Sequence, residues 1–235
     1  IGLTSEIVFF VFLPALVFES ALAIDIRRLL ADIWPILLLA ILGLLISSFL
    51  VGGAVWAVAG VPFVVCLLLG AILSATDPVA VVAIFKDLGA PKRLAVLVEG
   101  ESLFNDATAI VLFNIVAAII LTGAGASVMN GVQSFLTIFV GGILVGLIMS
   151  WVYVKVIARV QNMAVVEVTL TISLAYLSFL VAEHYLHVSG VMATVTSALV
   201  IGSKGRTAIS SDGWHLLKET WETLGFWANS LIFVL

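Results

Sequence analysis

Charged residues and cysteine are what this 235-residue sequence has least of. Only 10% of its residues are charged and 63% are hydrophobic, whereas a soluble domain has roughly 25% charged residues. This balance excludes a soluble globular domain and predicts an integral membrane protein in contact with the lipid bilayer. The basic residues form no patch, so no nucleic-acid partner is expected. A single cysteine, Cys66, excludes an internal disulfide framework and a cysteine metal site.

Long apolar runs separated by short polar connections predict an all-α, polytopic transmembrane helical bundle. A helix needs about 20 apolar residues to cross a bilayer. The sequence has about eight candidate stretches, several of which approach or exceed this length, while the seventh is short. They are 5–24, 33–58, 62–86, 94–121, 132–158, 163–184, 188–203 and 214–235. No linker or soluble region interrupts the series, so residues 1–235 are expected to form one membrane domain. The chain begins and ends inside apolar runs, which indicates part of a longer protein.

The positive charges predict how the chain is oriented in the membrane. All ten Lys and Arg residues lie in or beside alternate connections, and the connections between them have none. Because Lys and Arg are retained on the cytoplasmic side, residue 1 is predicted to lie outside and the basic connections in the cytoplasm. A plasma or bacterial inner membrane is the expected location. The ten residues are Arg27, Arg28, Lys86, Lys92, Arg93, Lys155, Arg159, Lys204, Arg206 and Lys218.

Two other ranges are interpreted as packing elements. The range 33–58 contains no charges and is expected to be scaffold. Gly142 and Gly146 form a small-xxx-small pair, which suits close helix contact. Packing within the chain is favoured over contact with a second subunit.

The range 62–86 has a polar interruption at its centre. Ser74, Thr76, Asp77 and Pro78 stand in the middle of an apolar run. Proline cannot donate the helical hydrogen bond and disfavours helix at the residue before it, so the helix is predicted to break near Thr76–Pro78. Unwound backbone at membrane depth is tolerated only where it lines a cavity or is buried in protein. Broken helices of this kind form ion sites in secondary transporters, and Asp77 is also suited to cap the following half-helix.

The stretch EGESLFNDATAIVLF, residues 99–113, concentrates polar side chains at the start of the next apolar run. A charged residue at the bilayer centre costs about 2.5–3.5 kcal/mol on insertion scales, so an acidic residue here is a functional-site hypothesis. If the segment is helical, Glu101 and Asn105 are one turn apart, as are Ser102 and Asp106. These four side chains then share one broad face.

Three further acidic residues are candidates for functional roles. Glu19 lies inside the first apolar run, and a buried functional role is favoured over a side chain that reaches back to the interface. Glu167 is interpreted as a pH-sensing or entry residue or as an acid that stabilises its helix N-terminus, the second being favoured. Glu183, His184 and His187 are expected to cluster on an external loop, where histidine can titrate near neutral pH. A solvated cluster is favoured there over a metal site.

Several motifs resemble one family. The chain is similar to the monovalent cation/proton antiporters of the CPA1 group, the sodium/proton exchangers, and the pieces TDP and ESLFND together are highly specific. The resemblance covers most of the chain through FLPALVFES, SATDPVAVVAIFKDLGAPKRL and VEGESLFNDATAIVLF, and more weakly through VAEHYLHVSGVMATVTSALVIG and FWANSLIFVL.

The resemblance implies roles for individual residues. Asp106 would be the carboxylate that binds the cation and the proton, with Ser102, Thr76 and Glu19 helping to coordinate the cation. Asp77 and Asn105 would stabilise the half-helix ends and the site. Glu101 matches a family glutamate that pairs with an arginine on a later helix. The implied architecture is an inverted-repeat antiporter fold, of which this chain would be a partial transport domain, assembled as a homodimer and requiring no cofactor.

A single titrating carboxylate suggests the mechanism. A hard monovalent cation prefers oxygen ligands, and the same carboxylate binds a proton when no cation is present, so the two compete. If the site opens alternately to both sides, cation and proton exchange, and Asn105 beside Asp106 suggests an electroneutral exchange. Na+ is the first expectation, with K+ and Li+ possible. The alternatives are a cation channel and a non-transporting remnant or sensor. An enzyme is not expected, because Ser74 and Ser102 have no histidine partner in the membrane interior.

Overall fold

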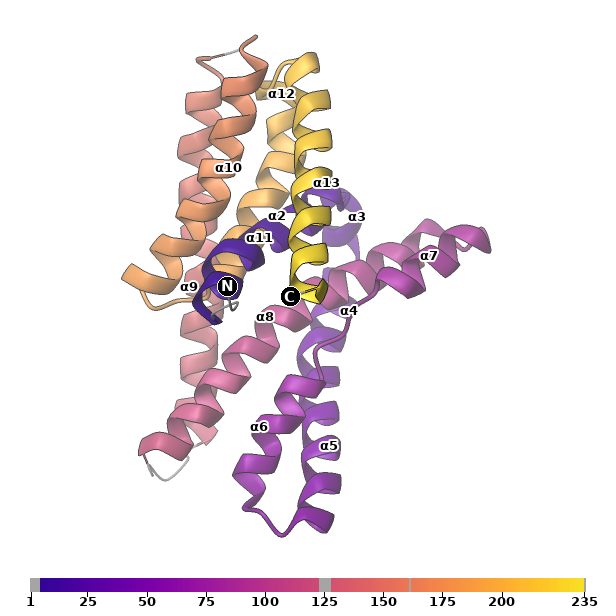
Figure 1. The fold of residues 1–235 in the computed structure, drawn as a ribbon, viewed down its shortest axis with the longest axis vertical. Helices are drawn as coiled ribbons and strands as arrows, with labels where there is room; N and C mark the ends of the chain where they lie inside the picture. Colours follow the sequence, from indigo (N-terminus) through magenta and orange to yellow (C-terminus); the bar gives the residue numbers. More distant parts are fainter. Residues whose placement is uncertain (1–4, 123–127, 161, 235) are drawn as a thin grey trace. The chain divides into compact units, whose positions relative to one another are not determined.

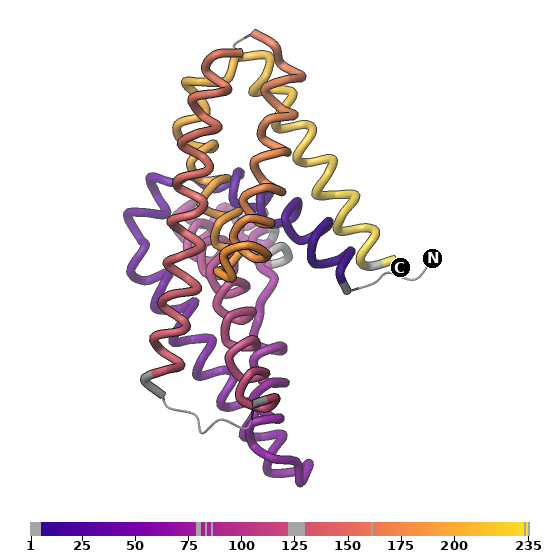
Figure 2. Tube along the Cα trace, turned by 90° about the vertical axis from the view of Figure 1, so that its left-hand side faces the viewer, coloured from indigo at the N-terminus to yellow at the C-terminus, as the bar shows by residue number. Residues whose placement is uncertain are grey.

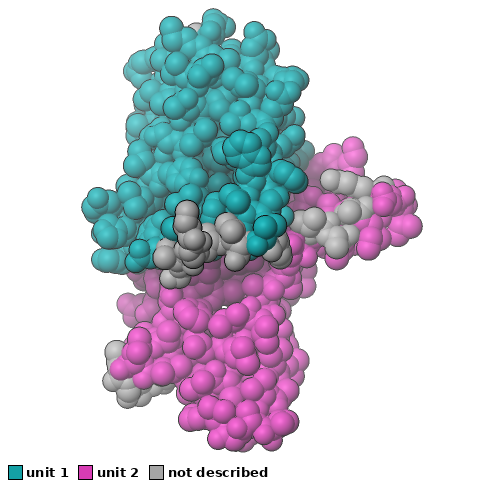
Figure 3. Space-filling view, viewed as in Figure 1, with its two compact units in different colours: residues 1–26, 140–235 teal, residues 27–139 magenta. Residues whose placement is uncertain are grey.

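The computed structural model describes residues 5–122, 128–160 and 162–234, and every regular element in these ranges is a helix. The chain forms two compact units, which Figure 3 distinguishes by colour. Unit 1 comprises residues 1–26 and 140–235, and unit 2 comprises residues 27–139. The predicted all-α fold is confirmed.

Unit 2 carries the broken segment and the acidic segment. The loop from α5 to α6 contains Gly60, whose positive φ of 65° ends α5 in the left-handed conformation that glycine adopts easily. Figure 2 shows the chain reversing there. The elements, labelled in Figure 1 except for the π-helical turn η2, are α3 (Ile26–Ala31), α4 (Ile33–Leu38), η2 (Leu39–Gly43), α5 (Leu44–Ala59), α6 (Phe63–Leu73), α7 (Val79–Asp87), α8 (Lys92–Thr122) and the first part of α9 (Val128–Ile157) up to Phe139.

Helices α5 and α6 pack with their backbones in direct contact. A Cβ at Gly70 would overlap the carbonyl oxygen of Ser48. A Cβ at Gly52 would lie only 3.0 Å from Leu67 Cα. Small residues permit this close approach. In lipid there is no hydrophobic driving force between helices, so van der Waals contacts of this kind stabilise the pair. The half-helix α6 is therefore held closely against α5.

Unit 1 is built around Trp221. Its ring stacks on Phe18 at a centroid distance of 4.3 Å, and its indole N–H donates to Thr171 Oγ1 at 3.1 Å. These two contacts join α13, α2 and α10. The elements are α1 (Ser5–Ile7), η1 (Val8–Phe12), α2 (Leu13–Ala23), α9 from Val140, α10 (Ala164–Leu180), η3 (Val181–Tyr185), α11 (Gly190–Val200), η4 (Ile201–Gly205), α12 (Arg206–Ala208) and α13 (Ser211–Val234).

The glycine pair on α9 packs inside unit 1. A Cβ at Gly142 would overlap the carbonyl oxygen of Ser189, and one at Gly146 would overlap that of Ala193. The hydroxyl of Ser197 donates to the Gly146 carbonyl at 3.2 Å. The prediction that this pair packs within the chain is confirmed.

A helical segment lies over each of the eight predicted ranges. Among the residues that the structure describes, four helical stretches have the length and hydropathy to cross a membrane, and the number of crossings beyond these stays a prediction. Large apolar side chains are exposed on the outer faces, for example Trp34 at 80% and Leu121 at 86%. Such surfaces suit lipid rather than water, so the chain is an integral membrane protein. The four stretches are Ile33–Ala59, Lys92–Leu121, Asn130–Ile157 and Ala164–Tyr185.

Two local features differ from the sequence interpretation. A short helix, α3, occupies the first basic connection. The predicted external loop at Glu183 and His184 is instead helical, because the turn η3 continues α10 to Tyr185. The Gly190 N–H, which donates to Glu183 Oε2 at 2.9 Å, keeps this glutamate against the start of α11.

Candidate functional site

The helix break lies where proline predicted it. Helix α6 ends at Leu73, residues 75–78 have no regular structure, and α7 begins at Val79. Pro78 removes one backbone donor and Asp77, the residue before it, is pushed out of helical conformation. The predicted discontinuous helix is confirmed. It leaves backbone carbonyls without helical partners.

Side chains of α8 bind the carbonyls that the break exposes. The Ser102 hydroxyl donates to the Thr76 carbonyl oxygen at 2.7 Å, and Asn105 Nδ2 lies 3.4 Å from the Ser74 carbonyl oxygen. Ser102 and Asn105 are both buried. The acidic segment and the broken segment, predicted separately, therefore come together in unit 2.

The Asn105 side-chain amide has one well-defined orientation. Its Nδ2 donates to Glu101 Oε1 at 2.8 Å and approaches Thr76 Oγ1 at 3.5 Å. The reverse orientation would direct the amide oxygen at a carboxylate, which is repulsive. The amide oxygen Oδ1 is consequently buried without a hydrogen-bond partner among the described residues. A buried acceptor in this state is ready to bind a cation or a donor.

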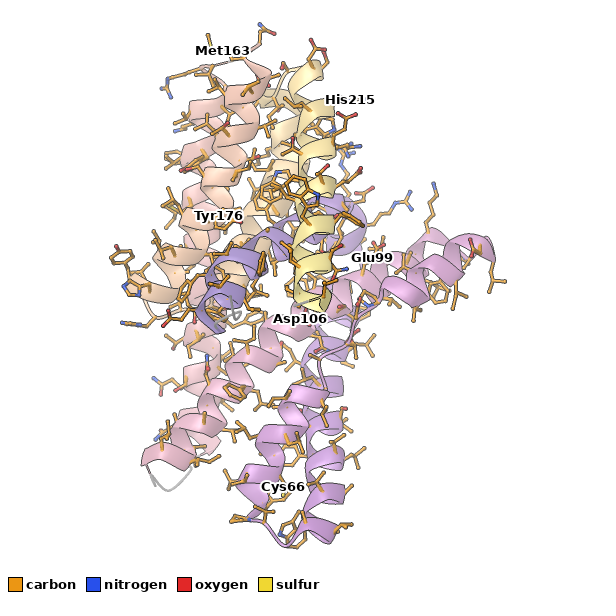
Figure 4. The ribbon with its side chains drawn as sticks, in the orientation of Figure 1. Cys66, Glu99, Asp106, Met163, Tyr176 and His215 are labelled. Atoms are coloured by element: carbon orange, nitrogen blue, oxygen red, sulfur yellow. The ribbon has the colours of Figure 1, made fainter. Side chains whose placement is uncertain are left out.

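Asp106 follows Asn105 on α8 and is labelled in Figure 4. Its side chain is half-buried. No hydrogen bond or ion pair from the described part of the chain reaches this carboxylate, and the charges that act on it come from the carboxylates of Asp77 and Glu101. Mutual repulsion among these groups favours the entry of a cation or a proton.

Glu101 is anchored by neutral partners. Besides the Asn105 amide, the Thr76 hydroxyl donates to Glu101 Oε2 at 3.4 Å. The later arginine that the family resemblance implies for this position stays a prediction. Asp77 lies two residues before the first residue of α7, where a carboxylate interacts favourably with the positive end of the helix dipole.

Glu19 lies in unit 1, whereas the other predicted site residues lie in unit 2. Its side chain packs beside Gly225 of α13, where a Cβ would lie 3.0 Å from Glu19 Cγ. The Glu222 carboxylate is the charge that acts on it. Its role as a cation ligand stays a prediction.

Sequence reasoning placed Ser74 in the polar interruption but missed Ser47, the residue that its hydroxyl meets. The Ser74 hydroxyl lies 3.0 Å from Ser47 Oγ on α5 and 2.7 Å from the Gly70 carbonyl oxygen. Ser47 belongs to the range interpreted as scaffold. Its only signal in the sequence is a Ser-Ser pair in an otherwise apolar run.

The oxygens gathered in unit 2 suit a monovalent cation. They are the carboxylate of Asp106, on which the carboxylates of Asp77 and Glu101 act, together with the Asn105 amide oxygen, hydroxyls and unwound carbonyls. Within the described residues, no group of three or more His, Cys, Asp and Glu side chains is arranged to hold a metal ion. A hard ion of low charge needs no such group, since neutral oxygens are adequate ligands.

Comparison with protein families gives a match over nearly the whole chain. The model of the family described as "Sodium/hydrogen exchanger, transmembrane" matches residues 2–235. The Na(+)/H(+) antiporter ApNhaP of Aphanothece halophytica is 38% identical over 236 residues, which cover 100% of this chain and 45% of the relative. The Na(+)/H(+) antiporter NhaP of Pseudomonas aeruginosa is 39% identical over 237 residues, which cover 98% of this chain and 55% of the relative.

A solved structure has the same fold. The sodium proton antiporter MjNhaP1 from Methanocaldococcus jannaschii, determined at pH 8, superposes with a TM-score of 0.82 at 24% sequence identity. The match covers 95% of this chain and 55% of that one. The chain thus spans about half the length of the relatives that it matches.

Proposed function

Because this chain belongs to the sodium/hydrogen exchanger family, we propose that the protein containing it exchanges a monovalent cation for a proton across a membrane. Both ions would bind at Asp106. The relatives are named Na(+)/H(+) antiporters, which supports Na+ as the cation. K+ and Li+ share the same ligand chemistry.

The observation that carries the proposal is the state of the Asp106 carboxylate. It receives no hydrogen bond or ion pair from the described residues, although two other carboxylates act on it. A charge held in a membrane without donors is costly, so the carboxylate gains by binding either a cation or a proton. One carboxylate cannot fully satisfy both, so the two ions compete.

The neighbouring oxygens complete the proposed cation site. Asn105 Oδ1 is buried and has no hydrogen-bond partner in the part of the chain that the structure describes, and the Thr76 and Ser102 hydroxyl oxygens lie at the break. Glu19 is proposed as a further ligand. Because Asn105 is a neutral amide, Asp106 supplies the exchanged charge, which supports an electroneutral exchange of one cation for one proton.

Competition becomes transport when the site opens alternately to the two sides of the membrane. A cation released on one side leaves a carboxylate that takes a proton from that side. The proton is released on the other side when the next cation binds. The named relatives favour this exchange over a channel or a non-transporting sensor, in which uptake of one ion would not require release of the other.

The proposal includes a location and an assembly. The distribution of Lys and Arg supports residue 1 outside and basic connections in the cytoplasm. A plasma or bacterial inner membrane fits this orientation. The family resemblance supports a homodimer.

The test is cation-driven collapse of a pH gradient in proteoliposomes that contain the whole protein. Na+ and K+ are added separately to the parent, to Asp106→Asn and to Asp87→Asn. Asp87 is an exposed residue at the end of α7 that undergoes the same chemical change. We expect collapse with the parent and Asp87→Asn and none with Asp106→Asn.

Two results would contradict the proposal. Collapse by Asp106→Asn at the parent's rate would exclude competition at this carboxylate. A collapse rate that changes when the membrane potential is clamped at different values would exclude electroneutral exchange.

A further inference from the structure

A set of hydrogen bonds connects α5 to the candidate site through the end of α6. The Ser47 and Ser74 hydroxyls lie 3.0 Å apart, and the carbonyl of the same Ser74 accepts from Asn105 Nδ2 at 3.4 Å. We propose that Ser47 and Ser74 are positioning residues that set the geometry of the cation site through Asn105. This inference rests on the proposed exchange at Asp106.

On the α5 side of this connection, α5 and α6 are closely packed. A Cβ at Gly70 would overlap the Ser48 carbonyl oxygen, so the two helix backbones are in contact immediately before the break. The Ser74 hydroxyl also bonds to the Gly70 carbonyl oxygen at 2.7 Å. Ser74, which is buried and ends α6, is thereby held by its side chain to both α5 and its own helix.

On the side of the candidate site, few other hydrogen bonds fix the position of the unwound backbone. Residues 75–77 lie between the two half-helices, whereas the Pro78 carbonyl already accepts the first helical hydrogen bond of α7, from the Val82 N–H at 2.8 Å. Side chains therefore locate the carbonyls of the unwound segment before Pro78. Ser102 locates the Thr76 carbonyl at 2.7 Å. Ser74 is located from the opposite side, by Ser47, and the Ser74 carbonyl in turn accepts from the Asn105 amide.

The orientation of the Asn105 amide connects this geometry to cation binding. Its Nδ2 is shared between Glu101 Oε1 and the Ser74 carbonyl, which leaves Oδ1 as the available ligand. If Ser74 moves, Nδ2 loses an acceptor and Oδ1 is no longer held in one place. Cation affinity should then fall. Neither serine hydrogen-bonds to Asp106, so proton binding at that carboxylate should be unchanged.

The two neighbouring serines of α5 provide a matched pair of variants. Ser47 has a hydrogen bond to Ser74, whereas the Ser48 hydroxyl is buried without a partner in the described residues. Both Ser47→Ala and Ser48→Ala delete one hydroxyl from the same turn of the same helix. Ser47→Thr retains the hydroxyl. Ser74→Ala removes the hydroxyl from the other end of the bond.

The experiment measures Na+-driven pH-gradient collapse in proteoliposomes of the whole protein, as apparent KM and kcat over a range of pH. Loss of one hydrogen bond corresponds to roughly a three- to ten-fold change. We expect Ser47→Ala and Ser74→Ala to raise the apparent KM for Na+ by about this factor at every pH. The kcat per folded molecule and the pH at which protons begin to compete should be unchanged. Ser48→Ala and Ser47→Thr should resemble the parent.

A merely structural role would give a different pattern. Fewer folded molecules would lower the total rate without changing the KM, and that result for Ser47→Ala would overturn the proposal. An equal KM for Ser47→Ala and Ser48→Ala would also overturn it. If Asp106→Asn is inactive while Ser47→Ala has the parent's KM, only the positioning role is refuted. If Asp106→Asn transports like the parent, the proposed exchange itself fails.

Discussion

Asp106 in unit 2 and Glu167 in unit 1 are both acidic residues in long apolar helices, but their surroundings are opposite. Glu167 is fully buried and accepts hydrogen bonds from the Asn162 N–H at 3.0 Å, the Ser210 N–H at 3.2 Å and the Ser210 hydroxyl at 2.7 Å. The carboxylate of Asp106 accepts none from the described residues.

The difference shows how surroundings decide the role of a membrane carboxylate. Glu167 lies in the first turn of α10, and its partner Ser210 directly precedes α13 and accepts from the Gly213 N–H at 3.1 Å. Met163 and His215 mark these two helix starts at the same end of unit 1 in Figure 4. Backbone donors and helix dipoles stabilise this charge.

Glu167 therefore joins two helix ends and has no unused oxygen to offer an ion. Of the two interpretations drawn from the sequence, the geometry supports the acid that stabilises a helix N-terminus. Asp106 keeps its oxygens available, which is what a transported ion requires.

Among the variants that test this comparison, Glu167→Gln is expected to have the largest effect on stability. An amide would turn its NH2 group toward one of the three donors, so the free energy of unfolding should fall by about 2–3 kcal/mol. Thermal unfolding in detergent measures the change. Glu219→Gln, on an exposed face of α13, is the control and should leave the melting temperature unchanged.

The same measurement on Asp106→Asn sharpens the contrast. It should not lower the melting temperature, because no donor loses its acceptor. If Glu167→Gln left the melting temperature unchanged and abolished transport, Glu167 would belong with Asp106 as a functional carboxylate.

Glu183 lies in η3, which continues the C-terminal end of α10. Its substitution should have an intermediate effect on stability. It accepts one backbone hydrogen bond, from the Gly190 N–H at 2.9 Å, and is half-buried. Glu183→Gln retains one oxygen acceptor, so we expect a loss of no more than about 1 kcal/mol. The melting temperature should fall between those of the parent and Glu167→Gln. A loss as large as that of Glu167→Gln would show that the number of donors does not set the energy.

Substitution of Asp32 is expected to have the smallest effect on stability, because its partner is a solvent-exposed cation. Arg93 donates to both its oxygens, with Nε–Oδ2 at 2.9 Å and Nη2–Oδ1 at 2.6 Å. Hydrogen bonding from Arg93 lowers the pKa of the Asp32 carboxyl. A lowered pKa means that the pair contributes stability above the ordinary value of about 3.9 and loses it as the pH falls through the lower, folded value.

The melting temperature of Asp32→Asn should accordingly lie below that of the parent by a small amount that stays constant between pH 6 and 9. The difference should begin to shrink below about pH 4, the ordinary pKa of an aspartate, and should disappear as the pH falls through the lower pKa of folded Asp32. Arg93→Gln removes the same hydrogen bonds from the other side and should give the same small difference. Lys92→Gln, one residue before Arg93, is its charge-matched control. A difference that changed with pH near neutrality would require another titrating group in contact with the pair.

Much of the fold could be predicted because its causes are local. Pro78 breaks the helix through its own ring and missing N–H, and the apolar runs mark the helices. The motifs around Asp77 and Asp106 were sufficient to identify the family that the comparisons support. The residues available to the site could therefore be listed from the sequence.

The connections among those residues could not be listed in the same way. Ser47 and Ser74 are 27 positions apart, and Glu167 and Ser210 are 43 apart. Nothing near Glu167 in the sequence marks Ser210 as its partner. The pairing follows from the packing of α10 beside α13.

The sequence by itself determined that this is a helical membrane protein of the exchanger family, with one helix broken at Pro78 and an acidic residue at Asp106. These properties depend on composition and on steric effects within a few residues. Only the tertiary structure decided which carboxylates are saturated with donors and which remain available, and how the Asn105 amide is turned. Hydrogen bonds between distant segments exist only after the helices have packed, and those bonds separate Glu167 from Asp106.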